Sequence, residues 1–158
     1  MEVLFWLLIA LVFYTYVGYG ILLFFLVRIK RLLGGDKFKF DPAFEPDVTL
    51  VIPSYNEESI ILKKAENSLA LDYPREKLRI LFITDGSTDN TPNLLRGLEG
   101  IEVLHEDRRA GKSAAENRAM TYVKSPIVVF CDANTMLNKE SIRELVKYYQ
   151  YPQIGGVS

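Results

Sequence analysis

Polar side chains that could hold a ligand stand directly after apolar runs at three places in this sequence. Asp132 and Asn134 follow the run VVFC, and Asp85 follows the run LFIT. A third polar stretch, residues 53–58, follows the run VTLVI and reads PSYNEE. Carboxylate and amide oxygens can accept hydrogen bonds or bind a cation. A strand that ends in a carboxylate holds that group on a rigid element, as a binding site requires.

Each of these features also has a purely structural explanation. The sequence Asp85-Gly86-Ser87 suits a turn between a strand and a helix. Asp132 could cap a helix or close a turn, and Lys112 could be a solvated helix residue. The three polar stretches together favour a binding site, because a hydrophobic core needs no polar residues at three strand ends. The residue types alone leave the ligand open.

The elements that would position these residues alternate between strands and helices from residue 48 onward. Strands are predicted over 48–52, 78–84, 101–104 and 127–131. Helices are predicted over 57–70, from Thr91 as N-cap, over 112–123 and from Asn138 to 150, with a further element starting at 154. This alternation predicts an α/β fold with a mostly parallel sheet and flanking helices. Ligands bind beyond the carboxyl ends of the strands in such sheets, so Asp85 and Asp132 are expected at one shared edge.

The first part of the chain differs from the rest because residues 3–27 contain no charged side chain. A helix of that length exceeds the roughly 30 Å hydrocarbon core of a bilayer. The sequence RIKR at residues 28–31 follows, and positive flanks favour the cytoplasmic side. A cleaved signal peptide would instead carry positive charge before a shorter apolar run. We therefore expect a single transmembrane anchor with its basic flank at 1–31, a linker at 32–47 and a cytoplasmic domain at 48–158.

Composition and motif content exclude several classes of protein. The formal net charge of −1 gives no overall basic field, so no nucleic-acid partner is expected. Cys131 is the only cysteine, which excludes an intramolecular disulfide and a cysteine-based zinc site. The stretch GKS at 111–113 resembles the end of a P-loop, but Glu106 occupies the position of the required first glycine. His105, the only histidine, has no evident Ser or Asp partner in the sequence and is expected to be structural or solvated rather than catalytic.

Four sequence blocks together resemble the family 2 glycosyltransferases. The blocks read VIPSYNEE from residue 51, TDGSTD from residue 84, AGKSAAEN from residue 110 and FCDANT from residue 130. The apolar first segment resembles the membrane-bound members related to polysaccharide synthases. The resemblance implies a GT-A (Rossmann-like) fold, of which this chain would hold the amino-terminal, nucleotide-sugar-binding half at 48–158. It also implies a nucleotide-sugar donor, often a UDP-sugar, and a glycan or lipid-linked acceptor.

The resemblance carries over to single positions of this chain. The first loop would line the nucleoside pocket, Asp85 would hydrogen-bond the base, and Lys112 would lie near the nucleotide. Asp132 matches the first acid of the family's Asp-x-Asp motif, and with Asn134 it would hold Mg²⁺ or Mn²⁺. Such an ion would stabilise the charge of the departing diphosphate. The nucleotide-sugar-binding residues expected from the resemblance are Pro53, Tyr55, Glu57, Asp85, Lys112 and Asp132.

Two positions depart from the family pattern. Asn134 replaces the second acid of the Asp-x-Asp motif, which weakens metal binding, and Thr84 replaces the first acid of the Asp-Asp-Gly-Ser block. The general base of an inverting transfer is expected beyond Ser158. The predicted function is that of a membrane-bound inverting glycosyltransferase, of which this part alone is inactive. A non-catalytic nucleotide-binding or assembly module is the alternative, and a receiver-like α/β switch is disfavoured because no paired acids follow the first strand.

Overall fold

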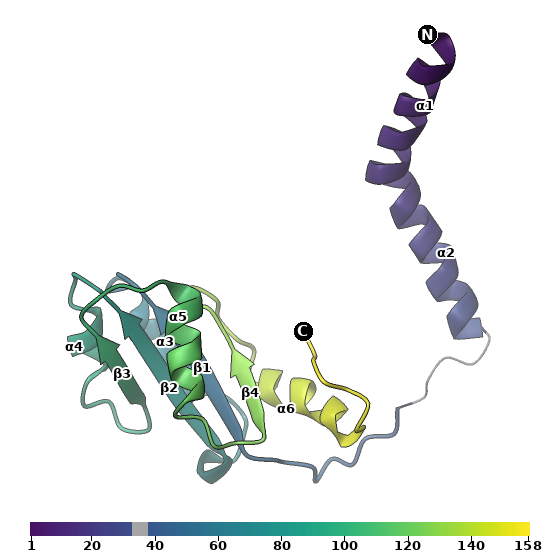
Figure 1. The fold of residues 1–158 in the computed structure, drawn as a ribbon. Helices are drawn as coiled ribbons and strands as arrows, with labels where there is room; N and C mark the ends of the chain where they lie inside the picture. Colours follow the sequence, from purple (N-terminus) through teal and green to yellow (C-terminus); the bar gives the residue numbers. More distant parts are fainter. Residues whose placement is uncertain (33–37) are drawn as a thin grey trace. The chain divides into compact units, whose positions relative to one another are not determined.

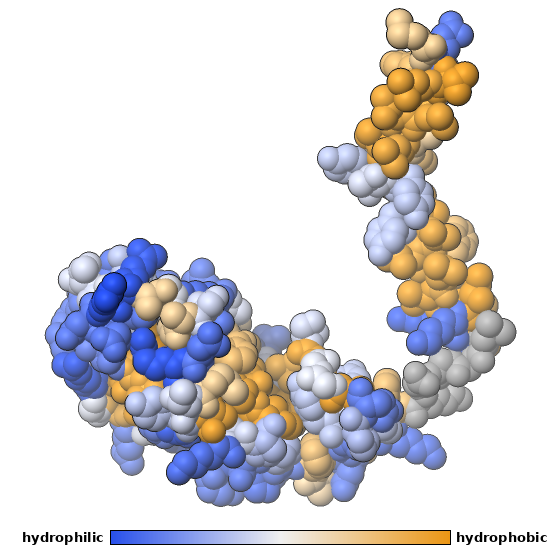
Figure 2. Space-filling view, viewed as in Figure 1, coloured by the Kyte–Doolittle hydropathy of each residue, from blue (hydrophilic) through white to orange (hydrophobic). Residues whose placement is uncertain are grey.

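A computed structural model describes residues 1–32 and 38–158 of the chain, which form two compact units, Met1–Lys39 and Phe40–Ser158. The first unit contains α1 (Glu2–Phe13) and α2 (Tyr19–Leu32), joined through a π-helical turn at Tyr14–Gly18 (Figure 1). Hydrophobic side chains cover most of this helix (Figure 2), which is long and apolar enough to cross a membrane, with a mean hydropathy of 2.1 in its apolar window. Residues 33–37 of the linker predicted at 32–47 lie outside the described residues.

A parallel four-stranded sheet forms the centre of the second unit (Figure 1). Its strands are β1 (Val48–Ser54), β2 (Leu78–Asp85), β3 (Glu102–Glu106) and β4 (Ile127–Phe130). Their order is β3-β2-β1-β4, so Val48 of β1 pairs with Leu78 on one side and with Ile127 on the other. The direction in which successive strands are added therefore reverses beside β1, which creates a topological switch point between β1 and β4. This arrangement confirms the predicted α/β fold class.

Helices cover both faces of the sheet. They are α3 (Ile61–Leu69), α4 (Thr91–Leu95), α5 (Lys112–Met120) and α6 (Ser141–Val146). Leu50 and Phe82 belong to a buried cluster with residues of α3, α4 and α6, whereas Val51 and Leu81 pack with Ala115 of α5. Successive strand residues thus point to opposite layers, and the strands read as continuous apolar runs because both faces are buried.

The predicted helix over 57–70 begins only at Ile61, and the difference has a tertiary cause. The Glu57 N–H donates a hydrogen bond to Thr91 Oγ1 at 2.9 Å, and residues 58–60 between Glu57 and the helix form a turn. The prediction of Thr91 as N-cap of α4 is therefore wrong, and Asn90 occupies that position. A hydrogen bond between residues so distant in sequence leaves no trace in local periodicity.

The first strand continues past Pro53, where the sequence predicts its end, to Ser54. The Val51 carbonyl accepts the Cys131 N–H at 3.1 Å, so Val51 faces β4. Pro53, two residues later, faces the same side, beyond the last β1–β4 pair of Val51 with Phe130. Because β4 has no pairing partner at this position, the missing N–H of Pro53 breaks no hydrogen bond of the sheet.

The remaining differences concern the ends of elements. The third strand is shifted to 102–106, and α5 ends at Met120 rather than at residue 123. The last helix begins at Ser141 with Glu140 as N-cap, not at Asn138, and passes at Val146 into a 3₁₀ turn. Residues 154–158 form no regular element.

Candidate functional site

A cavity of about 240 Å³ lies at the carboxyl ends of β1, β2 and β4. Three loops and the first residues of α5 contribute its walls, as expected for the switch point of a parallel sheet. The lining includes every site residue predicted from the sequence: Pro53, Tyr55, Glu57, Asp85, Lys112, Asp132 and Asn134. Residues as far apart in sequence as Pro53 and Asn134 therefore line one cavity.

Asp85 is a buried wall of this cavity, only 5% exposed. Its Oδ2 accepts hydrogen bonds from the N–H groups of Ala110 at 2.9 Å and Gly111 at 2.7 Å, and its Oδ1 accepts one from Arg118 at 3.3 Å. Burial by itself raises the pKa of this carboxyl, but the three donors together hold the pKa below its ordinary value. Asp85 therefore fixes the loop before α5 as an ionised acceptor.

Gly86 packs against the same loop from the other side. Its N–H donates to the Glu106 carbonyl at 2.8 Å, and its φ of +67° is in the left-handed region. A Cβ at this position would lie 2.5 Å from the backbone nitrogen of Arg109 and 2.7 Å from its Cα. Only glycine fits there without moving the loop.

Arg109 is held by this packing over the first loop. Its guanidinium carbon lies 3.8 Å from the centre of the Tyr55 ring, a cation–π contact at the cavity wall. Tyr55 as a whole remains 36% exposed. The pair thus offers a flat, positively charged surface to a ligand.

The first loop is itself bound to the loop after β2. The backbone N–H of Thr88 donates to Asn56 Oδ1 at 2.8 Å, and the backbone N–H of Glu58 donates to Asp89 Oδ2 at 3.0 Å. Asn56 adopts a φ of +53°, which asparagine tolerates better than most residues. These bonds fix Glu57 at the cavity wall.

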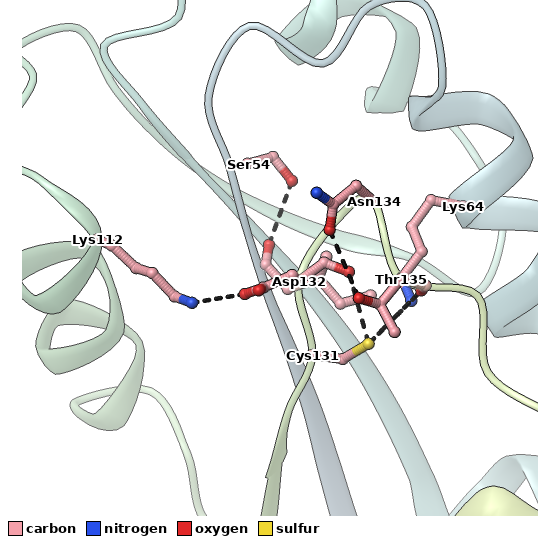
Figure 3. Close-up of polar contacts among 8 residues, drawn as sticks. Ser54, Lys64, Lys112, Cys131, Asp132, Asn134 and Thr135 are labelled. Carbon is pink, nitrogen blue, oxygen red and sulfur yellow. Dashed lines mark hydrogen bonds and ion pairs between the residues drawn. The ribbon is translucent and has the colours of Figure 1, made fainter. Parts of the chain in front are cut away.

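Asp132 is the open carboxylate of the site. Its Oδ1 accepts a hydrogen bond from Lys112 Nζ at 2.5 Å (Figure 3), and this bond raises the pKa of the lysine. The two side chains are 55% and 58% exposed, so solvent screens the pair. Asn134, on the same turn, also lines the cavity, and its Oδ1 accepts a long hydrogen bond from Thr135 Oγ1 at 3.5 Å.

These donors fit a divalent cation that a ligand helps to coordinate. Among residues 1–32 and 38–158 there is no group of three or more His, Cys, Asp or Glu side chains that could hold a metal by themselves. Mg²⁺ commonly binds one or two carboxylates and completes its octahedron with phosphate oxygens and water. Asp132 and Asn134 supply a donor set of that kind.

Two arginines, Arg109 in the cavity lining and Arg118 bound to Asp85, belong to no sequence motif that could have identified them. Arg109 lies in a polar loop, and Arg118 resembles an ordinary basic residue in the last turn of a helix. Within the described residues the Arg118 Nε is buried and has no hydrogen-bond partner, while its Nη1 pairs with Asp85. His105 bonds Thr84 Oγ1 at 2.7 Å and Asp107 Oδ1 at 3.0 Å and is not among the cavity-lining residues.

Comparisons with known sequences agree on one family. The model of glycosyl transferase family 2 matches residues 49–158. Beta-monoglucosyldiacylglycerol synthase of Nostoc sp. is 30% identical over 118 residues, which cover 71% of this chain and 25% of that protein. Poly-beta-1,6-N-acetyl-D-glucosamine synthase of Staphylococcus aureus is 30% identical over 115 residues, which cover 70% of this chain and 27% of that protein. The chain thus spans about a quarter of the length of these curated relatives.

Solved structures share the fold. Mannosyltransferase PcManGT from Pyrobaculum calidifontis, in complex with GDP-Man and Mn²⁺, superposes with a TM-score of 0.76 at 32% identity, covering 89% of this chain and 43% of that chain. TarS of S. aureus in complex with UDP-GlcNAc gives a TM-score of 0.57 at 22% identity, covering 62% of this chain and 29% of that chain, which shows the fold alone. The sheet, the matched residues and these relatives together show that the chain belongs to glycosyltransferase family 2 and carries its GT-A fold.

Proposed function

We propose that this chain binds the nucleotide-sugar donor of a membrane-bound inverting glycosyltransferase. In the whole enzyme the sugar passes to a polysaccharide or lipid-linked acceptor at the cytoplasmic face of the membrane. The observation that supports this most directly is the convergence of seven residues from strand ends, loops and the start of α5 on one cavity. The general base of the transfer is proposed to come from beyond Ser158.

The nucleoside is proposed to bind at the Tyr55 side of the cavity. Aromatic and guanidinium planes bind nucleobases by stacking, and Tyr55 with Arg109 presents such planes. Pro53 and Glu57 border them in the same wall. Asp85 contributes in two ways: it fixes the wall, and its Oδ1, with a single long hydrogen bond, retains capacity to accept one from the base.

The diphosphate is proposed to bind at the Asp132 side. Asp132 and Asn134 would hold Mg²⁺ or Mn²⁺, which supplies positive charge to the departing diphosphate. Lys112 can leave Asp132 and turn to a phosphate oxygen, because the side chain is long and exposed. Two related structures hold GDP-Man with Mn²⁺ and UDP-GlcNAc, so both nucleotides are candidates for this chain.

The first unit is proposed to be a membrane anchor. Its helix spans Glu2–Leu32 and carries its basic residues in the last turns. Positive residues favour the cytoplasmic side, so the second unit would face the cytoplasm. The proposed domain division is an anchor at 1–31, a linker at 32–47 and a donor-binding half domain at 48–158.

Isothermal titration of the full chain in detergent micelles tests the proposal. UDP and GDP are titrated separately, with and without Mn²⁺, and we expect one of them to bind in a Mn²⁺-dependent manner. Asp132→Asn should weaken that binding by about ten-fold or more. Asp72→Asn is the matched control, because Asp72 is also an exposed aspartate paired with a basic residue but lies outside the cavity. Failure of both nucleotides to bind a chain that circular dichroism shows to be folded would contradict the proposal.

A further inference from the structure

Lys64, on α3, is fully buried although it carries an ammonium group. Burial of a charge is costly unless polar groups surround it, and lysine is seldom found inside a protein. None of the ion pairs formed within the described part of the chain includes Lys64. A neutral side chain would fill this position at lower cost, so the ammonium needs a specific reason.

The partners of Lys64 lie at the two ends of the turn that carries the open carboxylate (Figure 3). Its Nζ donates to the Thr135 carbonyl at 2.5 Å and to Cys131 Sγ at 3.1 Å. The turn is closed internally, because the Thr135 N–H donates to the Asp132 carbonyl at 3.1 Å. Lys64 thus holds both ends of the segment from which Asp132 and Asn134 reach the cavity, while it lines no part of the cavity itself.

A second side chain on the same face of α3 extends this hold. Asn67 donates from Nδ2 to the Leu137 carbonyl and accepts the Leu137 N–H at Oδ1, both at 2.9 Å. Residues three positions apart on a helix are neighbours on one face. Lys64 and Asn67, here called the α3 clamp, therefore tie residues 131–137 to the helix that directly follows the first cavity loop.

We propose that Lys64 is a positioning residue for the diphosphate and cation side of the cavity. The inference rests on the proposed function and extends it to a residue that touches no ligand. A charged donor makes shorter and stronger hydrogen bonds than a neutral one, so it fixes the direction of Asp132 and Asn134 more firmly. The clamp also links this turn to the loop that carries Tyr55, which sets the spacing between the two ends of the site.

Amide hydrogen exchange of the full chain without ligand tests the clamp by itself. In Lys64→Met, exchange of the amides in residues 132–137 should rise by about ten-fold or more, because hydrogen bonds to a charged donor are lost. The amides of Ala110 and Gly111, held by Asp85, should keep their protection. Ser68→Ala is the matched control: it removes a buried hydrogen bond of the same helix, from Ser68 Oγ to the Lys64 carbonyl, without touching the turn.

Titration with Mn²⁺ and the nucleotide that wild type binds then measures the consequence. Lys64→Met should weaken Mn²⁺-dependent binding of the nucleoside diphosphate by about ten-fold, as loss of a residue that orients metal ligands does elsewhere, and Ser68→Ala should leave it unchanged. If Lys64 has only a structural role, Lys64→Met and Ser68→Ala will both change thermal stability and neither will change the affinity for the nucleotide. If Lys64→Met does not fold, Asn67→Ala tests the clamp through its other member, because it removes both bonds to Leu137 and leaves the bonds of Lys64 in place.

The outcomes separate this inference from the proposed function. Unchanged exchange at 132–137 in a folded variant overturns the clamp whatever the ligand. Faster exchange with unchanged affinity overturns the positioning role. Absence of nucleotide binding in wild type instead contradicts the proposed function, while the exchange result still decides whether Lys64 holds the turn.

Discussion

Asp85 and Asp132 both follow an apolar strand and both line one cavity, but their surroundings are opposite. The Asp85 side chain is 6% exposed and accepts hydrogen bonds from two backbone N–H groups and from Arg118. The Asp132 side chain is 55% exposed and pairs with the equally exposed Lys112. The comparison teaches that a carboxylate at a strand end can be held mainly by internal donors, as Asp85 is, or can stay open to solvent, as Asp132 is.

The largest effect is expected from removal of the internal carboxylate. Asp85→Ala leaves two N–H groups and the partly buried Arg118 without their acceptor, so the free energy of unfolding should fall by about 3 kcal/mol. Denaturation of the full chain by urea measures it. Asp107→Ala removes an exposed aspartate that bonds His105 and should change stability by no more than about 0.5 kcal/mol. Equal losses of unfolding free energy in Asp85→Ala and Asp107→Ala would contradict the distinction between a buried carboxylate that holds the cavity wall and an exposed one.

A substitution at Gly86 tests whether close packing against the Arg109 backbone holds the loop before α5 in place. Gly86→Ala places a methyl group against the Arg109 backbone at positive φ, and we expect a loss of about 2 kcal/mol in unfolding free energy. Gly97→Ala is the control, because Gly97 has a φ of +84° with open space around it, and should cost about 1 kcal/mol. A larger loss at Gly97 than at Gly86 would mean that backbone conformation alone, not loop packing, accounts for the effect.

The pH dependence of stability sharpens the comparison further. The pKa of Asp85 is lower in the folded chain than its ordinary value of 3.8, so the folded state favours the ionised form. Its contribution is complete above that value and is lost as pH falls through the lower folded pKa. Wild type should therefore lose more stability than Asp85→Asn between about pH 5 and pH 2 in urea titrations. Parallel curves for the two proteins would contradict this assignment.

The smallest effect concerns the open carboxylate. Lys112 competes with any cation for Asp132, and exposed ion pairs are weak, so Lys112→Met should tighten binding of Mn²⁺ alone by about three-fold. The same change should weaken nucleoside diphosphate binding, because the proposed contact between Lys112 and a phosphate oxygen would be lost. Lys77→Met, which breaks a partly exposed pair with Glu45, is the control in calorimetry. Weaker binding of both ligands would show that Lys112 and the cation do not compete.

The sequence predicts the layers of the fold and most of the cavity lining because both depend on short-range patterns. Continuous apolar runs mark strands buried on both faces, and the residues after them meet at one edge whenever the strands are parallel. Pro53, Asp85 and Asp132 could be named on this basis. The cavity brings them together with the residues that the family resemblance added.

The parts that sequence reasoning missed depend on contacts between distant residues. The start of α3 is set by Thr91, and the loop before α5 is set by Asp85 and Gly86. Arg118 and Lys64 look like solvated helix residues in sequence, and only the packing of their helices against the sheet turns them inward. Periodicity contains no information about such partners.

The strand order has a consequence for how the protein is made. Val48 pairs with Ile127 only after the intervening elements have left the ribosome, whereas β1, β2 and β3 are joined by shorter connections. Contacts between residues far apart in the chain form late, since a long loop must close first. A nascent chain can thus assemble the first three strands before the fourth is available, and the cavity at the ends of β1, β2 and β4 takes shape only after β4 has been synthesised.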